Sequence, residues 1–156
     1  MSKLVVFFSQ TGRTKAVAEG IAEELRVPIE SITCPQGKAR IKPLRSHWQD
    51  SDLPVISSRL QNLDAFQEII LGGPVWAFNI APPLLSFVKK MSWKGKKVIL
   101  FITEAGMGGK RALRTVKEEL EKQGAQVTAE KIFTSIFKSQ RRLKEQGKEW
   151  AQRMKK

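Results

Sequence analysis

Short apolar runs alternate with amphipathic stretches along the whole of this chain. The first run, Leu4 to Phe8, has no polar position, which is typical of a strand buried on both faces in a parallel sheet. Similar runs predict five strands, at about 4–8, 27–33, 68–76, 96–103 and 127–133. The second run alternates and has a proline near its start, so we expect it at an edge of the sheet.

The stretches between these runs have the period of a helix. After the first strand, Val17, Ile21 and Leu25 recur four residues apart and form one apolar stripe. The same pattern predicts helices at about 15–25, 81–91, 110–123 and 139–154. A further short helix, capped by an Asp, is expected at about 52–63. Residues 34–52 show no period and are predicted to form a long surface loop.

Strands that alternate with helices predict an α/β fold, in which a parallel sheet has helices on both faces. Right-handed crossovers leave few topologies, and five strands fit the doubly wound order 2-1-3-4-5. A length of 156 residues with 41% apolar content suits a single domain, which we expect to span residues 1–156. In such sheets a ligand binds beyond the carboxyl ends of the strands, where the order reverses between the first and third strands.

The turn between the first strand and the first helix is suited to an anion. Backbone N–H groups at a helix start lack internal partners and carry the positive end of the helix dipole, which favours phosphate. Gly12 lets the backbone approach a ligand, Arg13 adds charge, and three hydroxyl groups can donate hydrogen bonds. An ordinary N-cap would explain the Ser and Thr residues equally well. The candidate residues are Ser9, Gln10, Thr11, Gly12, Arg13 and Thr14.

This turn, Ser-Gln-Thr-Gly-Arg-Thr after a hydrophobic strand, resembles the phosphate loop of the flavodoxins, Ser/Thr-x-Thr-Gly-x-Thr. In that family the loop holds the phosphate of FMN. A Walker loop would end in Gly-Lys-Ser/Thr and a dinucleotide fingerprint needs three spaced glycines, so ATP and NAD are weaker candidates. The resemblance covers about residues 3–133, because two more loops match in order and spacing. It implies a flavodoxin-like doubly wound sandwich with a five-stranded parallel sheet, and FMN as the cofactor.

The second loop follows the third strand and resembles the flavodoxin pattern Gly-x-Pro-x-aromatic, which lies along the flavin ring. By this resemblance Trp76 stacks on the isoalloxazine, although a core position is the alternative for so large a ring. Asn79 and the backbone N–H groups of the two residues before it are expected to bond the ring edge. The implied cofactor-binding residues are Pro74, Val75, Trp76, Ala77, Phe78 and Asn79.

The third loop follows the fourth predicted strand and, by the same resemblance, approaches the pyrimidine side of the flavin. Its glycines permit close contact, and Glu104 can accept from the ring N3–H or be a solvated surface acid. The implied residues are Thr103, Glu104, Ala105, Gly106, Gly108 and Gly109. The chain has no Tyr, and this loop has no aromatic residue where electron-transfer flavodoxins place a second ring. One face of the flavin is therefore expected to be open.

An open face suggests how the protein is used. It leaves room for a nicotinamide or a quinone to stack for hydride transfer, whereas a ring covered on both faces suits electron transfer through its edge. The first hypothesis is an FMN oxidoreductase that acts on a small electron acceptor such as a quinone or porphyrinogen, with NAD(P)H as donor. The alternatives are an electron carrier that docks on an acidic redox partner protein, and a flavin-fold binding protein without a redox role. The chemistry belongs to the flavin, so no side chain is expected to be catalytic.

The charge departs from the family pattern, because well-known flavodoxins are acidic. Here 28 Lys and Arg stand against 15 Asp and Glu, a net charge of +13. Such a surface favours an acidic protein or a membrane surface, or it only keeps the protein soluble; we expect no specific nucleic acid. Cys34 is the single cysteine, which argues against a cysteine-based metal site. Without a signal peptide or a membrane span, a cytoplasmic location is expected.

Overall fold

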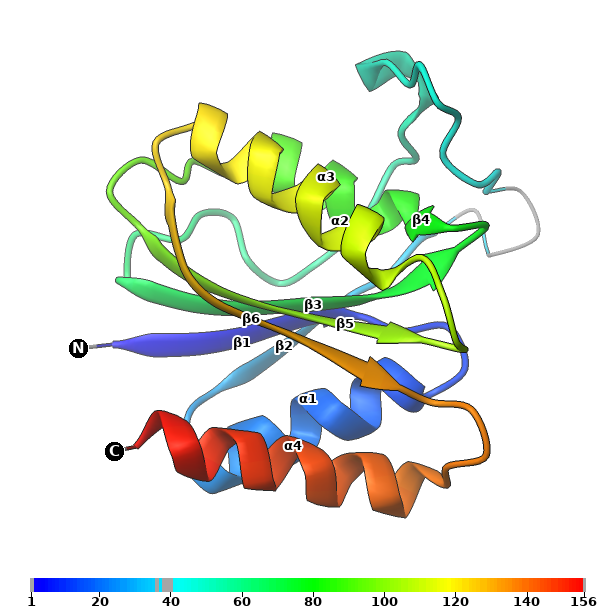
Figure 1. Cartoon of the computed structure of the whole chain (residues 1–156). Helices are drawn as coiled ribbons and strands as arrows, with labels where there is room; N and C mark the ends of the chain where they lie inside the picture. The colour runs from blue at the N-terminus through cyan, green and yellow to red at the C-terminus, as the bar shows by residue number, and fades with distance from the viewer. Residues whose placement is uncertain (1, 36, 38–40, 156) are drawn as a thin grey trace.

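The structure, a computed structural model, describes residues 2–35, 37 and 41–155 and is built around one sheet (Figure 1). Its main strands are parallel and lie in the order β2-β1-β3-β5-β6. A short strand, β4, pairs antiparallel with the end of β3. The bounds are β1 Lys3–Phe8, β2 Ile29–Ile32, β3 Glu68–Trp76, β4 Asn79–Ile80, β5 Lys97–Glu104 and β6 Gln126–Thr134. With β4 set aside, this is the predicted order 2-1-3-4-5, and the doubly wound α/β fold is confirmed.

Helices cover both faces of the sheet, as predicted. In Figure 1, α2 and α3 lie above the sheet, and α1 and α4 lie below it. Their bounds are α1 Arg13–Leu25, α2 Pro82–Lys90, α3 Gly109–Lys122 and α4 Gln140–Met154. None of the helices in the described part of the chain is both long and apolar enough to cross a bilayer.

Two hydrophobic cores, one on each face, explain why the central strands are apolar throughout. Successive side chains of a strand point to opposite faces. In β1, Leu4 and Val6 enter the core under α2 and α3, whereas Val5 and Phe7 enter the core under α1 and α4. Because both faces are covered, neither set of positions can be polar without losing buried apolar area.

The contact between α1 and α4 depends on two glycines. A Cβ atom on Gly20 would meet the carbonyl of Lys144, and one on Gly147 would lie 2.5 Å from the carbonyl oxygen of Val17. Real Cβ atoms do not come so close to backbone oxygens, so the two helices pack at a distance that only glycine permits. This contact holds the last helix against the first, although more than a hundred residues separate them in the sequence.

The helix predicted at 52–63 is wrong. The structure has only a single 3-10 turn there, Asp50–Asp52, followed by irregular chain up to β3. The N–H and carbonyl groups of Ser57 bond those of Thr33 at 2.8–2.9 Å, and the carbonyl of Pro54 accepts from the Ser86 hydroxyl. These long-range hydrogen bonds take backbone groups that a helix would have used, so tertiary structure overrides the local pattern. Of the predicted loop 34–52, residues 36 and 38–40 lie outside the described residues, as do the ends, residues 1 and 156, of the predicted domain.

Candidate functional site at the carboxyl edge of the sheet

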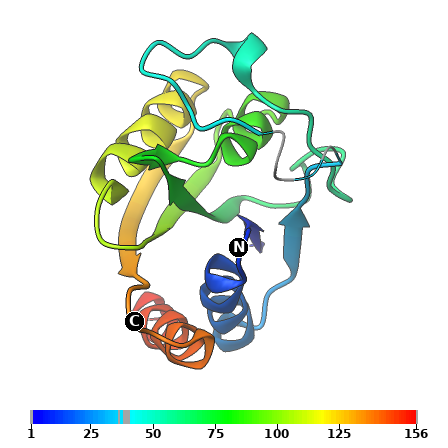
Figure 2. The same cartoon turned by 90° about the vertical axis from the view of Figure 1, so that its right-hand side faces the viewer.

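The carboxyl ends of the parallel strands meet at one edge of the molecule, which faces the viewer in Figure 2. Each helix begins at this edge, because it follows a strand. We call the edge the rim, comprising residues 9–15, 74–82, 103–111 and 134–142. The three predicted loops all belong to it.

The first turn is held by a side-chain hydroxyl. Ser9 Oγ accepts hydrogen bonds from the N–H groups of Gly12 and Lys15, both at 3.2 Å. Gly12 is the N-cap of α1 with φ of 91°, a left-handed conformation that favours glycine. Among the described residues, no acceptor bonds the N–H groups of Arg13 and Thr14. Two unpartnered donors therefore remain at the positive end of α1.

A hydroxyl pair joins the first loop to the third. Thr14 Oγ1 lies 2.7 Å from Thr103 Oγ1, and both side chains are buried. Either oxygen can be the donor. Since each hydroxyl has one proton and the pair uses one, the other proton stays available to an acceptor outside the pair.

The second loop forms a tight hairpin that the sequence did not reveal. Val75 pairs with Ile80 and Trp76 with Asn79, which leaves two residues in the turn. The turn residues, Ala77 and Phe78, have φ of 47° and 70°. Positive φ at both central positions is the pattern of a type I′ hairpin, which usually selects Asn-Gly. An Ala-Phe turn is strained, and such strain is often found at ligand sites.

The aromatic rings of this loop point to different places. Trp76 is half-buried and packs edge-to-face against Phe8, with ring centroids 5.6 Å apart. Phe78, at the tip of the hairpin, is 57% exposed. The predicted stacking of Trp76 on the flavin stays a prediction, and the structure adds Phe78 as a second aromatic candidate.

The third loop folds against the hairpin. Gly108 has φ of 95°, and a Cβ atom on it would lie 2.7 Å from a methyl group of Val75 and 2.8 Å from the Cα of Phe78. Glu104 Oε2 accepts a hydrogen bond of 2.9 Å from the Gly109 N–H. One carboxylate oxygen of Glu104 thus orders this loop, which leaves the other for the predicted ring contact.

Two hollows open on the rim, and they share Val75 and Ala105 in their walls. The first has a volume of about 100 Å³ and a lining of mixed polar and apolar character, whereas the second has about 400 Å³ and is mainly apolar. The first is lined by Gln10, Thr11, Arg13, Thr14, Pro74, Val75, Trp76, Thr103, Glu104, Ala105 and Ser135. The second is lined by Val75, Ala77, Phe78, Ala105, Gly106 and Met107.

Most of the predicted residues are thus brought together. The predicted residues that do not line either hollow are Ser9, Gly12, Asn79, Gly108 and Gly109. Ser135 was missed; its N–H and hydroxyl donate to the carbonyl of Glu104 at 2.7 and 3.0 Å. Its place directly after the last strand could have indicated it, because every carboxyl end reaches the rim.

The comparison with protein families agrees with this geometry. The sequence profile of the family described as Flavodoxin matches residues 2–153, nearly the whole chain. The chain belongs to the flavodoxin family. An uncharacterized protein of Archaeoglobus fulgidus is 31% identical to this flavodoxin-family chain over 120 residues, which is 76% of each chain.

Solved structures share the fold. A putative flavoprotein from Bacteroides uniformis is similar with a TM-score of 0.74 and 23% identity, covering 99% of this chain and 98% of its own. A flavoprotein from Lactobacillus acidophilus, solved in complex with FMN, has a TM-score of 0.68 and 20% identity over 84% of this chain and 92% of its own. At these identities the comparison shows the flavodoxin-like fold.

Asn79 bonds the backbone of its own hairpin, and its predicted contact with the flavin ring stays a prediction. It is buried, and its Oδ1 accepts from the Ile80 N–H at 2.8 Å. Its side chain faces another hollow, between α3 and the segment around Trp48. Asn79 therefore lies on the far side of the hairpin from the apolar hollow and stabilises the turn itself.

The hollow behind the hairpin is organised by Lys89. Its ammonium lies 2.8 Å from Glu119, 3.3 Å from Asp50 and 5.4 Å from the ring centroid of Trp48. Burial alone would raise the pKa of Glu119, but hydrogen bonds from Lys89 and Lys122 outweigh it and hold that pKa below its usual value. The ion pairs of Lys89 with Asp50 and Glu119 connect the segment around Trp48 to α2 and α3.

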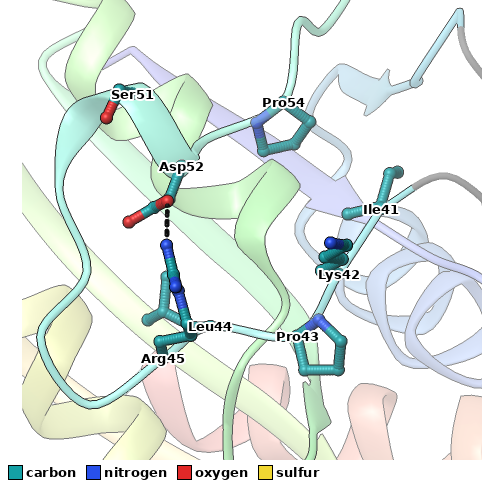
Figure 3. A pocket seen from close by; sticks show the side chains of 8 residues that line it. All are labelled: Ile41, Lys42, Pro43, Leu44, Arg45, Ser51, Asp52 and Pro54. Carbon is teal, nitrogen blue, oxygen red and sulfur yellow. Dashed lines mark hydrogen bonds and ion pairs between the residues drawn. The ribbon is translucent and has the colours of Figure 1, made fainter.

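Another hollow, of about 450 Å³, lies away from the predicted residues (Figure 3). Its walls come only from the segment 41–54, in which Arg45 donates to Asp52 at 2.8 Å. No residue of the flavodoxin-like loops lines it. Among the described residues, no group of three His, Cys, Asp or Glu side chains is arranged to hold a metal ion.

Proposed function

We propose that this protein binds FMN across the two joined hollows of the rim and passes electrons or hydride through it to a small acceptor, such as a quinone or porphyrinogen. The observation that carries the proposal is the pairing of the hollows. A small hollow at the start of α1, lined by Thr11, Arg13 and Thr14, shares Val75 and Ala105 with an apolar hollow between two loops. This order matches a ligand with a phosphate at one end and a flat ring at the other.

The smaller hollow fits the phosphate end. The free N–H groups of Arg13 and Thr14 lie at the positive end of α1, and Thr11 and Arg13 line the same hollow. Hydrogen bonds to a charged phosphate are about twice as strong as those between neutral groups. The hydroxyl pair of Thr14 and Thr103 supplies one further proton at the floor of this hollow.

The apolar hollow fits the ring end. Its walls are small or apolar side chains of the hairpin and the third loop, with a glycine, Gly106, at the turn. Bound FMN would supply the redox chemistry, since no protein side chain here is needed for it. The FMN complex of the Lactobacillus acidophilus flavoprotein, which shares the fold, supports this assignment.

The third loop favours an enzyme over a carrier. Ala105, Gly106 and Met107 are all exposed, and no aromatic side chain of this loop closes the apolar hollow. A second ring, the nicotinamide of NAD(P)H or a quinone, would have room to stack there. A carrier that docks on an acidic redox protein stays the alternative, because the net charge of +13 serves it equally well. A cytoplasmic location is part of the same proposal.

A visible spectrum of the purified protein, followed by titration with FMN and FAD, tests the cofactor. We expect flavin absorbance and a clear preference for FMN, because the unpartnered N–H groups at the start of α1 suit a terminal phosphate. NADH and NADPH are then added to the FMN-loaded protein with a quinone. Consumption of either nucleotide without a partner protein supports the oxidoreductase, whereas FMN binding without consumption supports the carrier. Failure to bind FMN would exclude both redox hypotheses and leave the hypothesis of a binding protein without a redox role.

A further inference from the structure

The rim concentrates the positive charge of the molecule. It contains seven Lys or Arg residues and a single acid, Glu104, so it carries about half of the net charge of +13. Arg141 and Arg142 form ion pairs with acids further along α4. Among the described residues, no acid forms an ion pair with the other five, which are Arg13, Lys15, Lys110, Arg111 and Lys138.

Several of these positive charges lie in the first turns of helices, where positive side chains are normally unfavourable. Acidic residues are favoured in the first turn of a helix because they offset its positive end. All four α-helices begin at the rim, and none has an acid in its first turn. Three of them carry Lys or Arg there instead. The helix dipoles and the side chains therefore add, and the rim attracts anions more strongly than its side chains alone would.

Apolar side chains protrude from the same rim. Phe78, Met107 and Phe137 are 57%, 65% and 99% exposed, and Ile136 is 48% exposed. They come from three separate loops, which reach the same side of the molecule in Figure 1. Phe137 also has φ of 59°, a strained conformation for a bulky residue. Because the side chain is almost fully exposed, its packing does not offset the backbone strain at Phe137.

We propose that the rim docks on an anionic membrane surface, with Ile136 and Phe137 entering the headgroup layer and Lys110, Arg111 and Lys138 contacting lipid phosphates. Apolar side chains among Lys and Arg are the composition of peripheral membrane-binding surfaces. The shape favours lipid over an acidic protein, because separate protruding tips need matching pockets on a protein, whereas a lipid surface accepts them without a fixed shape. The docking does not depend on the flavin. If FMN binds as proposed, the mouth of its apolar hollow faces the membrane, where a lipid-soluble acceptor would reach it.

Co-sedimentation with vesicles tests the proposal. The full chain is mixed with large vesicles of phosphatidylcholine alone or with about a third phosphatidylglycerol, before and after FMN is added. We expect binding only to the anionic vesicles, at about the same level in both cases. Binding that needs no anionic lipid, or no binding to either vesicle, would overturn the proposal and leave the acidic protein partner as the explanation of the rim. A failure to bind FMN is read separately, from the absorbance spectrum.

Matched variants locate the surface. The pair Ile136→Ser with Phe137→Ser should weaken vesicle binding about tenfold, whereas Ile29→Ser, at the opposite edge and 40% exposed, should leave it unchanged. The pair Lys110→Gln with Lys138→Gln should weaken it about tenfold. The control pair Lys94→Gln with Lys97→Gln removes the same charge from the opposite edge and should have little effect.

Two results would contradict the proposed surface. Equal losses of vesicle binding in the two lysine double variants would show that the net charge attracts the protein to the vesicles without orienting the rim toward them. A lower sedimentation coefficient for Phe137→Ser in the absence of vesicles would show that the rim instead joins two copies of this chain. Both results overturn membrane docking, and neither bears on whether FMN binds.

Discussion

The helix layer below the sheet is closely packed, whereas the rim at the end of the sheet has strained backbone and exposed side chains. In the layer, Gly20 and Gly147 remove atoms so that α1 and α4 can touch, and the stripe that faces the sheet is apolar. At the rim, non-glycine residues have positive φ at Ala77, Phe78 and Phe137, and first turns lack acids. Apart from Arg26 at the end of α1, the non-glycine residues with positive φ lie at the rim, where we propose that the chain binds something else. The helix layer stabilises the fold, whereas the rim carries backbone strain and unfavourable charges that cost stability.

The largest effect is expected in the layer, from Gly147→Ala. In an exposed helix this change stabilises by about 1 kcal/mol. Here the added methyl would collide with the Val17 carbonyl, so we expect a loss of about 3 kcal/mol in the free energy of unfolding, measured with urea. Glu149→Ala, on the exposed face of the same helix, is the control and should change it by less than about 0.5 kcal/mol. A neutral Gly147→Ala would show that the two helices can separate freely.

At the rim, Thr11→Ala with Thr14→Ala should reduce ligand affinity. If both hydroxyls bond the phosphate, each bond contributes about 1.5–3 kcal/mol, so the dissociation constant for FMN should rise at least tenfold. Thr115→Ala, on α3, is the control. Because Thr14 is buried against Thr103, the unfolding of the double variant is measured too. An unchanged affinity in a folded double variant would remove the phosphate assignment.

The two aromatic residues of the hairpin give a smaller and more local test. Trp76→Ala should weaken FMN binding by about fivefold and restore flavin fluorescence, because a stacked ring contributes about 1 kcal/mol beyond its burial. Trp48→Ala should do neither, since Trp48 lies against Lys89 behind the hairpin. If only Phe78→Ala restored fluorescence, the flavin ring would lie against the hairpin tip rather than against Trp76.

Relieving the backbone strain at Phe137, in the rim, should raise the free energy of unfolding. Phe137→Gly relieves a positive φ without removing any packing, so we expect the protein to gain about 0.5–1 kcal/mol in thermal or urea unfolding. Phe137→Ala keeps the strained conformation and should change little, which makes it the matched control. A loss of stability in both variants would mean that the Phe137 ring supports the fold after all.

The smallest effect concerns the charge around the flavin. A positive charge about 10 Å away in water favours the anionic reduced form by roughly 0.4 kcal/mol before screening. We therefore expect the potential for adding the second electron to bound FMN to be less negative than in acidic flavodoxins. It should fall as salt rises from about 0.01 M to 1 M, because the Debye length shrinks from about 30 to about 3 Å. A reduction potential that does not change with salt would show that contacts between the protein and the flavin ring set the potential.

The sequence alone determined the layers, the strand order and the place of the site. Apolar runs such as Leu4 to Phe8 can only be buried on two faces, and helix stripes at fixed spacing can only cover them. Once the strands are parallel, their carboxyl ends share one edge. The first turn, the second loop and the third loop were therefore predicted to lie together, and the ends of the predicted strands and helices differ from the structure by one or two residues.

The tertiary structure decided what depends on residues far apart in the chain. The contact of Thr14 with Thr103 and the turn at Ala77 and Phe78 have no local signal. Residues 52–63 have a helical pattern, yet hydrogen bonds from Ser57 to Thr33 keep them extended. Periodicity reports which side of an element is buried, whereas long-range hydrogen bonds and backbone strain are set only when the elements meet.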